Sequence, residues 1–213
     1  MPPGPMRLYG YHRSTATWRV RIGLHWKGLA FSTEAVDLRA GAQHAPAWRA
    51  RHPQGLVPAL ELADGTVLTQ SLAILEWLEE TVPQPPLLPP DPIVRARVRA
   101  VALAIACDTH PLQNLSVLQR VEALAGAAAA RTWAADVVAR GLGAVERMVD
   151  PGPFAFGARV SLADVLIVPQ LANARRFGVD LGSLPRLLAI EEACNALPAF
   201  QASRPEAQPD FPG

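Results

Sequence analysis

The sequence predicts an α+β fold in which a mixed N-terminal domain is followed by an all-α domain. Strand and helix patterns alternate up to residue 81, apolar residues at helical spacing dominate after residue 92, and a proline-rich stretch separates the two regions. That stretch, VPQPPLLPPDP at 82–92, has six prolines among eleven residues, so neither a helix nor a central strand can run through it. We therefore expect domains at 6–83 and 93–202, a linker at 84–92 and a loosely ordered tail at 203–213.

The first elements of the N-terminal domain form a β-α-β unit. Residues 7–11 have the pattern of a short strand, and 17–27 carry apolar side chains on two sides of a predicted helix. Gly28 can provide the left-handed C-terminal cap of that helix, and 31–38 resemble a second strand. Because a β-α-β crossover joins parallel strands, the first two strands are expected to be parallel.

A hairpin and a helix complete this domain. The turn signal Ala63-Asp64-Gly65 lies between two short apolar runs, 59–62 and 66–68, which predicts an antiparallel hairpin. A helix is expected at 72–80, and the weakly patterned residues 45–51 supply a middle helix. The order β-α-β-α-β-β-α is the thioredoxin-like arrangement.

The second domain is expected to be a helical bundle. Apolar residues recur at helical spacing within 94–105 and again within 138–149. Ser161 and Asp164 have the spacing of an N-terminal capping box before the apolar run 165–171. Pro169 should bend that helix, and Gly178 can end it.

Charge and composition exclude several classes of function. Twenty basic and nineteen acidic residues give a net charge of +1, so nucleic acid and anionic lipid are poor candidates as partners. Every stretch of about 18 residues contains a charge, and the start MPPGPMRLYG lacks the layout of a signal peptide, so a cytoplasmic protein without a membrane segment is expected. Cys107 and Cys194 fit neither a disulfide scaffold nor a zinc site, and we expect no metal and a core position for Cys107.

The first candidate for chemistry is the junction between the first strand and the following helix. Ser14, Thr15 and Thr17 place hydroxyl groups where the helix leaves backbone N–H groups free. A thiolate at this point would feel the positive end of the helix dipole and could accept a hydroxyl hydrogen bond, and both effects lower its pKa. The alternative is an ordinary helix cap, for which Ser and Thr are common.

Two further loops should lie beside this junction. A cis bond before Pro58 would turn the main chain of Val57 outward to pair with a peptide, although Val-Pro is also common in plain turns. Gln70 and Ser71 begin the third helix and could hold an acidic group, although they could equally be a simple cap. Together, the three loops suggest a site for a small thiol peptide.

These motifs resemble the soluble glutathione transferase superfamily, specifically its zeta class, which includes maleylacetoacetate and maleylpyruvate isomerases. The resemblance covers nearly the whole chain. It rests on RSTATWRVRIGL (13–24), HPQGLVPAL (52–60), TQSLAILEWLEE (69–80), LLPPDP (87–92), HPLQNLSVL (110–118), SLADVLIVPQLANARRFGVDL (161–181) and QPD (208–210). It implies a thioredoxin-like domain that binds glutathione, a helical domain that completes the substrate pocket, and a homodimer.

The resemblance also implies roles for individual residues. Ser14 would hydrogen-bond the glutathione sulfur, with Thr15 nearby, and Arg13 and Arg176 would bind the carboxylates of a dicarboxylic oxo acid. The expected contacts of glutathione are Ser14, Gln43, Val57, Pro58, Gln70, Ser71, His110 and Asn114, with His44 a weaker candidate beside Gln43. The implied reaction is cis-trans isomerisation by reversible addition of the glutathione thiolate to the double bond, most simply of maleylacetoacetate.

Several alternatives stay open. Ala16 replaces a cysteine that the zeta pattern usually carries, and CDTHP (107–111) is nearer to the maleylpyruvate isomerases. Other readings are a transferase that conjugates small electrophiles such as α-haloacids, and a non-catalytic interaction domain of the same fold. Tyr9 and Tyr11 are expected to be core residues rather than activators of glutathione. His12, His25 and His52 are expected to be surface or loop residues without a ligand role.

Overall fold

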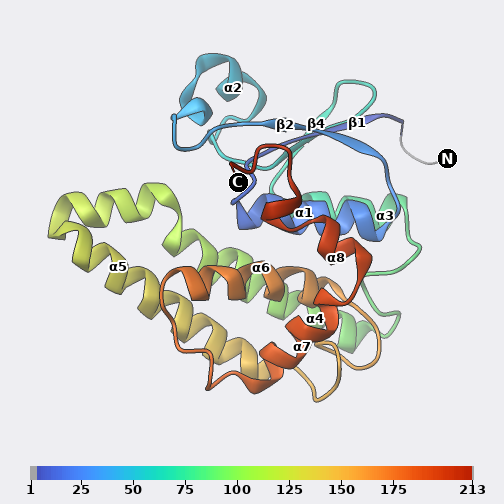
Figure 1. Cartoon of the computed structure of the whole chain (residues 1–213). Helices are drawn as coiled ribbons and strands as arrows, with labels where there is room; N and C mark the ends of the chain where they lie inside the picture. Colours follow the sequence, from blue (N-terminus) through green and yellow to red (C-terminus); the bar gives the residue numbers. More distant parts are fainter. Residues whose placement is uncertain (1–3, 213) are drawn as a thin grey trace. The chain divides into compact units, whose positions relative to one another are not determined.

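The computed structural model describes residues 4–212 and divides the chain into two compact units. The first unit ends at Pro86 and takes in the chain again from Ala196 onward, and the second is Leu87–Asn195. Residues 1–3 lie outside the described residues. They belong to the N-terminal stretch whose layout led us to expect no signal peptide. Figure 1 shows the elements of both units.

The first unit is built on a four-stranded sheet. Its strands are β1 (Met6–Gly10), β2 (Phe31–Ala35), β3 (Ala59–Glu61) and β4 (Val67–Thr69). They lie in the order β2-β1-β3-β4. β1 and β2 are parallel, and β3 and β4 form an antiparallel hairpin, so both strand predictions are confirmed. The sheet and its helices have the predicted thioredoxin-like order.

Helices cover both faces of this sheet. α1 (Thr15–Trp26) and α3 (Ser71–Thr81) lie on one face, and the short α2 (Pro46–Arg51) lies on the other (Figure 1). α1 and α3 approach closely because Gly23 has no side chain: a Cβ atom there would be 2.3 Å from Cδ2 of Leu75. The prediction that α1 is covered on two sides is confirmed, since nine of its twelve residues are buried.

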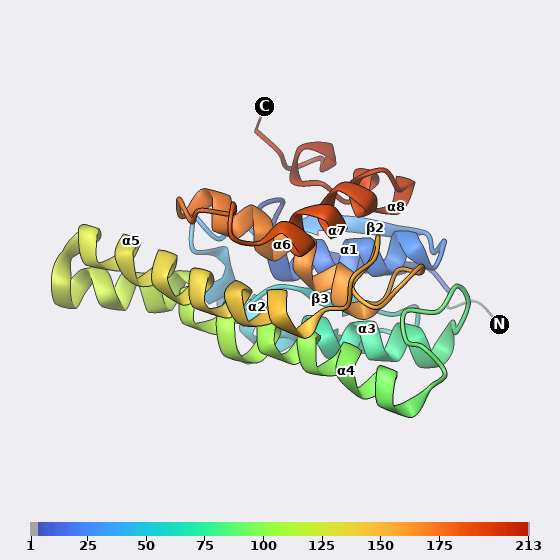
Figure 2. The same cartoon turned by 90° about the horizontal axis from the view of Figure 1, so that it is seen from below.

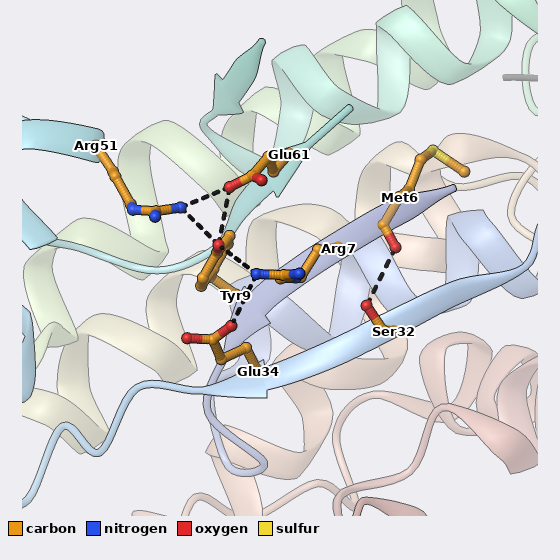
Figure 3. Close-up of polar contacts among 7 residues, drawn as sticks. All are labelled: Met6, Arg7, Tyr9, Ser32, Glu34, Arg51 and Glu61. Carbon is orange, nitrogen blue, oxygen red and sulfur yellow. Dashed lines mark hydrogen bonds and ion pairs between the residues drawn. The ribbon is translucent and has the colours of Figure 1, made fainter. Parts of the chain in front are cut away.

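Tyr9 belongs to the core on the α2 face of the sheet. Its ring packs against Trp48, with 5.3 Å between ring centroids. Its hydroxyl donates to Oε2 of Glu61 at 2.8 Å and accepts from Nη1 of Arg51 at 2.6 Å, and Figure 3 shows these side chains pointing toward one another. Arg7 and Glu34 extend this polar network across the strands. The hydroxyl of Tyr9 is thus used within the sheet, as expected of a core tyrosine.

The C-terminal segment is ordered against α1 and differs from the expected loose tail at 203–213. The helix α8 (Pro198–Ala202) packs beside α1 (Figure 1). Nε of the buried Arg21 on α1 donates to the carbonyl of Ser203 at 3.1 Å. A buried guanidinium needs such acceptors, and Phe200 adds a fully buried aromatic ring. For this reason the chain from Ala196 groups with the first unit, and not with a helical domain ending at residue 202.

The second unit is helical. Its long helices are α4 (Pro92–Leu103), α5 (Leu115–Met148), α6 (Leu162–Arg176) and α7 (Pro185–Asn195). A π-helical turn (Ala104–Thr109) and a 3₁₀ turn (His110–Gln113) connect α4 to α5. The chain turns back within α5 (Figure 2), because Gly126 has the non-helical angles φ 87° and ψ 165°.

Two expectations for this unit have opposite outcomes. The capping box is confirmed: N–H of Ser161 donates to Oδ2 of Asp164 at 2.7 Å, and α6 begins at the next residue. The core position of Cys107 was wrong, because Cys107 is exposed. Cys107 lies in the π-helical turn, whose wider spiral moves side chains away from the α-helical spacing on which the prediction depended.

Candidate active site

The strand register brings three loops of the first unit to one end of the sheet. Tyr9 pairs with Ala59, and Ala59 pairs with Thr69. The loop before α1 follows this end of β1, Val57 and Pro58 precede β3, and Gln70 and Ser71 follow β4. Six residues predicted to bind glutathione or its thiol therefore lie in segments at or next to this end of the sheet. They are Ser14, Gln43, Val57, Pro58, Gln70 and Ser71.

Ser14 caps α1 and keeps its hydroxyl hydrogen available. Its Oγ accepts the N–H of Thr17 at 3.2 Å, and its own N–H donates to the carbonyl of Tyr11 at 2.9 Å. Within residues 4–212 the structure gives its hydroxyl no acceptor, and the side chain is half-buried. The hydroxyl can thus donate to a thiolate while the N-terminus of α1 adds a favourable dipole. Thr15 follows as the first helical residue and is buried.

Val57 has free main-chain hydrogen-bonding groups at the same end of the sheet. Neither its N–H nor its carbonyl has a hydrogen-bond partner among the described residues. The Val57–Pro58 peptide is cis, which is the alternative to a plain turn that the sequence left open. An extended peptide could satisfy both free groups of Val57, in the way that a strand adds to a sheet edge.

Gln70 and Ser71 start α3 in an unusual conformation. Gln70 has φ 68° and ψ 118°, and no other non-glycine residue described has a positive φ. Its Nε2 donates to Oε1 of Gln54 at 2.6 Å. The side chain of Gln70 does not cap α3, so the first N–H groups of this helix can receive a carboxylate. Oγ of the buried Ser71 accepts from Nη1 of Arg19 at 3.5 Å, which links this helix end to α1.

Gln43 presents a buried acceptor or donor beside the loop that carries Val57. Its Oε1 is buried without a partner in the described chain, and its Nε2 is 3.1 Å from Nε2 of His44. The loop comes close to Gln43 at Gly55, where a Cβ atom would be 2.9 Å from the Gln43 carbonyl oxygen. Since φ of Gly55 is 62°, glycine suits this position on both grounds.

The remaining predicted residues divide between the two units. Arg13 is exposed in the loop before α1. In the second unit, the exposed Arg176 ends α6, with its guanidinium carbon 5.3 Å from the centre of the Phe177 ring. His110 has Nδ1 at 3.3 Å from Nε2 of Gln113, and Asn114 precedes α5 without capping it through its side chain.

Two features near the site were not predicted from the sequence. Gln54, the partner of Gln70, carries no sequence signal beyond its place in the motif HPQG. His12 and His52 lie in loops, which is one of the two positions expected for them, but both are buried and not at the surface. His12 is held by the C-terminal segment, through an N–H bond of 2.7 Å to Oδ2 of Asp210. The ring of His52 lies 6.1 Å from that of Trp48, measured between ring centroids, and burial lowers the pKa of His52.

The site fits a small thiol peptide with carboxylate groups. Val57 supplies main-chain groups for the peptide, the start of α3 receives a carboxylate, and the buried Oε1 of Gln43 awaits a donor. Ser14 is available for the sulfur.

Among residues 4–212, no group of His, Cys, Asp and Glu could hold a metal ion. In the same range, no helix has the length and apolar character needed to cross a membrane.

Comparisons with known proteins identify close relatives. The model of the glutathione S-transferase N-terminal domain matches residues 13–81. Maleylacetoacetate isomerase of Pseudomonas aeruginosa is 47% identical, over 97% of this chain and 99% of its own. A crystal structure of maleylacetoacetate isomerase from Anaeromyxobacter dehalogenans, with glutathione in the active site, is 50% identical with a TM-score of 0.90, covering 98% of both chains. The holo structure of maleylpyruvate isomerase, a bacterial zeta-class glutathione S-transferase, is 43% identical with a TM-score of 0.92, covering 96% and 99%.

Proposed function

Since the chain belongs to the glutathione S-transferase family, in its zeta class, we propose that it is a glutathione-dependent cis-trans isomerase of a dicarboxylic oxo acid. The preferred reaction is the conversion of maleylacetoacetate to fumarylacetoacetate. The observation that carries this proposal is that Ser14, Val57 and the start of α3 lie at the same end of the sheet. The bound glutathione of the Anaeromyxobacter relative supports glutathione as the cofactor.

Each residue of the first unit has a distinct task in binding glutathione. The main chain of Val57 pairs with the cysteinyl unit, which fixes the position of the sulfur. Gln70 and Ser71 hold the γ-glutamyl end at the start of α3, and Gln43 binds the glycyl end. Pro58 shapes the loop, and His110 and Asn114 of the second unit are assigned to the cofactor as well. When bound, glutathione supplies the thiolate that adds reversibly to the cis double bond of the substrate.

Ser14 and two arginines account for the remaining requirements. Ser14 donates its free hydroxyl hydrogen to the sulfur and favours the thiolate form, with Thr15 beside it. Arg13 and Arg176 bind the substrate carboxylates, since guanidinium groups match carboxylates with two parallel hydrogen bonds. Binding of the carboxylates fixes the orientation of the substrate, and the positive charge of the arginines stabilises the electron density that moves onto the substrate carbonyl during the reaction.

Maleylacetoacetate is preferred over maleylpyruvate as the substrate. The maleylacetoacetate isomerases of Pseudomonas aeruginosa and Anaeromyxobacter are 47% and 50% identical, against 43% for the maleylpyruvate isomerase. Ala16, in place of the usual zeta-class cysteine, does not remove the nucleophile, because that nucleophile comes from glutathione. We further propose a homodimer in the cytoplasm, which size-exclusion chromatography with light scattering and cell fractionation would test.

Calorimetry and substrate assays test this function together. The purified protein should bind reduced glutathione saturably and should isomerise maleylacetoacetate or maleylacetone only when glutathione is present. Faster turnover of maleylpyruvate would identify the other isomerase activity. Conjugation of an α-haloacid without any isomerisation would instead favour a transferase. Absence of glutathione binding would leave a non-catalytic domain and reject both enzyme functions.

A further inference from the structure

His12, two residues before Ser14, is anchored by one residue of α1 and one residue of the C-terminal segment of the first unit. Its N–H donates to Oδ2 of Asp210 at 2.7 Å, and its carbonyl accepts from Nη2 of Arg21 at 2.8 Å. Both main-chain groups of His12 are therefore fixed by charged side chains. Hydrogen bonds to charged groups are roughly twice as strong as those between neutral groups.

The imidazole ring of His12 is enclosed by the same segment. It packs edge-on against Phe211, with 5.7 Å between ring centroids, and lies 4.3 Å from the ring of Tyr11. Nδ1 of His12 is also 3.4 Å from Oδ2 of Asp210. The C-terminal segment therefore holds this loop by its backbone and by a side chain.

Arg21 ties the anchor to the helix that Ser14 caps. Its side chain is fully buried, and Nε donates to the carbonyl of Ser203 at 3.1 Å. Burial lowers the pKa of Arg21 to about 10, against the favourable charges of Asp210 and Glu206. Arg21 thus stays protonated at neutral pH and binds the loop and the C-terminal segment at once.

The C-terminal segment is itself held in a defined shape. Nε2 of the buried Gln208 donates to the carbonyls of Ala202 and Arg204 at 3.0 and 2.8 Å. The N–H of Phe211 donates to the carbonyl of Gln208 at 3.1 Å, which closes a turn around Asp210. The carboxylate of Asp210 consequently reaches His12 from a fixed position.

We propose that Asp210 is a positioning residue for thiol activation, which it serves by holding the loop that carries Ser14. The inference rests on the proposed function of this site. The loop is short, and the N–H of Ser14 bonds to Tyr11, the neighbour of His12. Displacement of His12 therefore moves Ser14 relative to the sulfur, and groups at reactive centres tolerate only about 0.5 Å of error.

A titration of bound glutathione measures this effect without relying on turnover. The ultraviolet absorbance of the thiolate is followed against pH in the wild type, Asp210→Ala, Asp210→Asn and Glu206→Gln. Asp210→Ala should raise the pKa of the bound thiol by roughly one unit and lower kcat about 10-fold, with little change in glutathione affinity. Asp210→Asn keeps an oxygen acceptor for His12 and should restore much of the wild-type behaviour.

Glu206→Gln is the matched control. Glu206 lies on the same segment and its charge also acts on Arg21, but among residues 4–212 its side chain makes no hydrogen bond to the loop. The thiol pKa should stay at the wild-type value in this variant. A shift as large as that of Asp210→Ala would mean that charge alone acts, and would overturn the positioning role.

A double-mutant cycle separates positioning from general damage to the fold. If Asp210 acts through Ser14, Asp210→Ala should not change the thiol pKa further in a Ser14→Ala background. An equal shift in both backgrounds would contradict the proposal. If Asp210→Ala does not fold, Asp210→Asn decides: a faster-exchanging His12 amide with an unaltered thiol pKa would also refute it. Failure of the wild type to bind glutathione would reject the proposed function instead.

Discussion

Lys27 and Glu79 form an ion pair inside the first unit, with 2.6 Å between Nζ and Oε2. Their side chains are 0% and 7% exposed, so the pair is almost wholly removed from water. Lys27 ends α1 and also donates to the carbonyl of Pro85 at 2.8 Å, while Glu79 lies on α3. The pair joins the two helices that cover one face of the sheet to the end of the unit's first chain segment.

Removal of one partner of this pair should destabilise the protein strongly. Lys27→Met removes the ammonium group that lies 2.6 Å from the buried Glu79 carboxylate, and we expect a loss of about 3 to 5 kcal/mol in the free energy of unfolding. The double variant Lys27→Met/Glu79→Leu removes both charges and should be more stable than Lys27→Met alone. Urea denaturation of the three proteins measures these differences. A double variant whose losses are simply additive would contradict the coupling.

Asp164 should make stability depend on pH in the acid range. Burial raises the pKa of Asp164 from 3.8 to about 6, although hydrogen bonds from Ala155 and Ser161 oppose the shift. Between these two values the folded protein binds more protons than the unfolded chain, so stability falls as pH rises through this window. The full effect is about 3 kcal/mol, from roughly 1.4 kcal/mol per pKa unit.

The pH dependence is tested by comparison with Asp164→Asn, which cannot titrate. The difference in unfolding free energy, wild type minus variant, should decrease between pH 4 and pH 6 and become constant above that. Denaturation curves at several pH values measure it for both proteins. A difference that does not vary with pH would show that Asp164 keeps its ordinary pKa.

Gln70→Gly should stabilise the protein and weaken its binding of glutathione. A φ of 68° with ψ of 118° is costly for glutamine and permitted for glycine, so the variant should gain about 1 kcal/mol of stability. It should bind glutathione more weakly, because the side chain assigned to the γ-glutamyl end is lost. Gln54→Ala is the control, since it removes the contact to Gln70 without freeing the backbone and should bring no gain. Thermal melting and calorimetry give the two readouts.

Ser14→Ala should affect turnover more than affinity. The variant loses the hydroxyl donor to the thiolate, and removal of one such donor in a preorganised site lowers kcat on the order of 100-fold. Glutathione should still bind, since its main-chain partner Val57 is unchanged. Ser14→Thr retains a hydroxyl and should preserve much of the rate. Steady-state kinetics of the isomerase reaction measure this, and an unchanged kcat in Ser14→Ala would exclude the assigned role.

Arg176 can be compared with its neighbour Arg175 on α6. Nη1 of Arg175 donates to Oε1 of Glu191 at 2.6 Å, so its charge is used within the second unit. Arg176→Ala should raise KM for the dicarboxylate about 10-fold or more, since a charge-assisted hydrogen bond to the substrate is lost. Arg175→Ala removes the same charge one residue away and should leave KM nearly unchanged. Equal effects in the two variants would assign only a general electrostatic role to Arg176.

Local signals made the fold and three loops of the site predictable. The hairpin is encoded where it forms, because Oδ1 of Asp64 accepts the N–H of Thr66 at 2.9 Å and Gly65 has φ 84°. The starts of α1 and α6 carry capping residues, Ser14 and Ser161, at the first turn. Once the strand order is known, such signals bring the loops to one sheet edge without further information.

Features that depend on distant residues could not be predicted in this way. His12 is polar and lies in a loop, and its partner Asp210 is 198 residues away in the sequence. The buried Arg21 resembles a surface residue of α1 until its acceptor at Ser203 is known. The contact of Gln54 with Gln70 depends on a left-handed backbone conformation that few glutamines adopt.

The division of the first unit into two sequence segments determines the order of events during synthesis. The segment from Ala196 emerges from the ribosome only after all of Leu87–Asn195, so the buried guanidinium of Arg21 has no Ser203 acceptor until the helical unit has been synthesised. The helical unit is continuous and meets no such delay. A nascent chain that stalls before Ser203 therefore carries a sheet without its final support, and this makes it a natural target for chaperones and proteases.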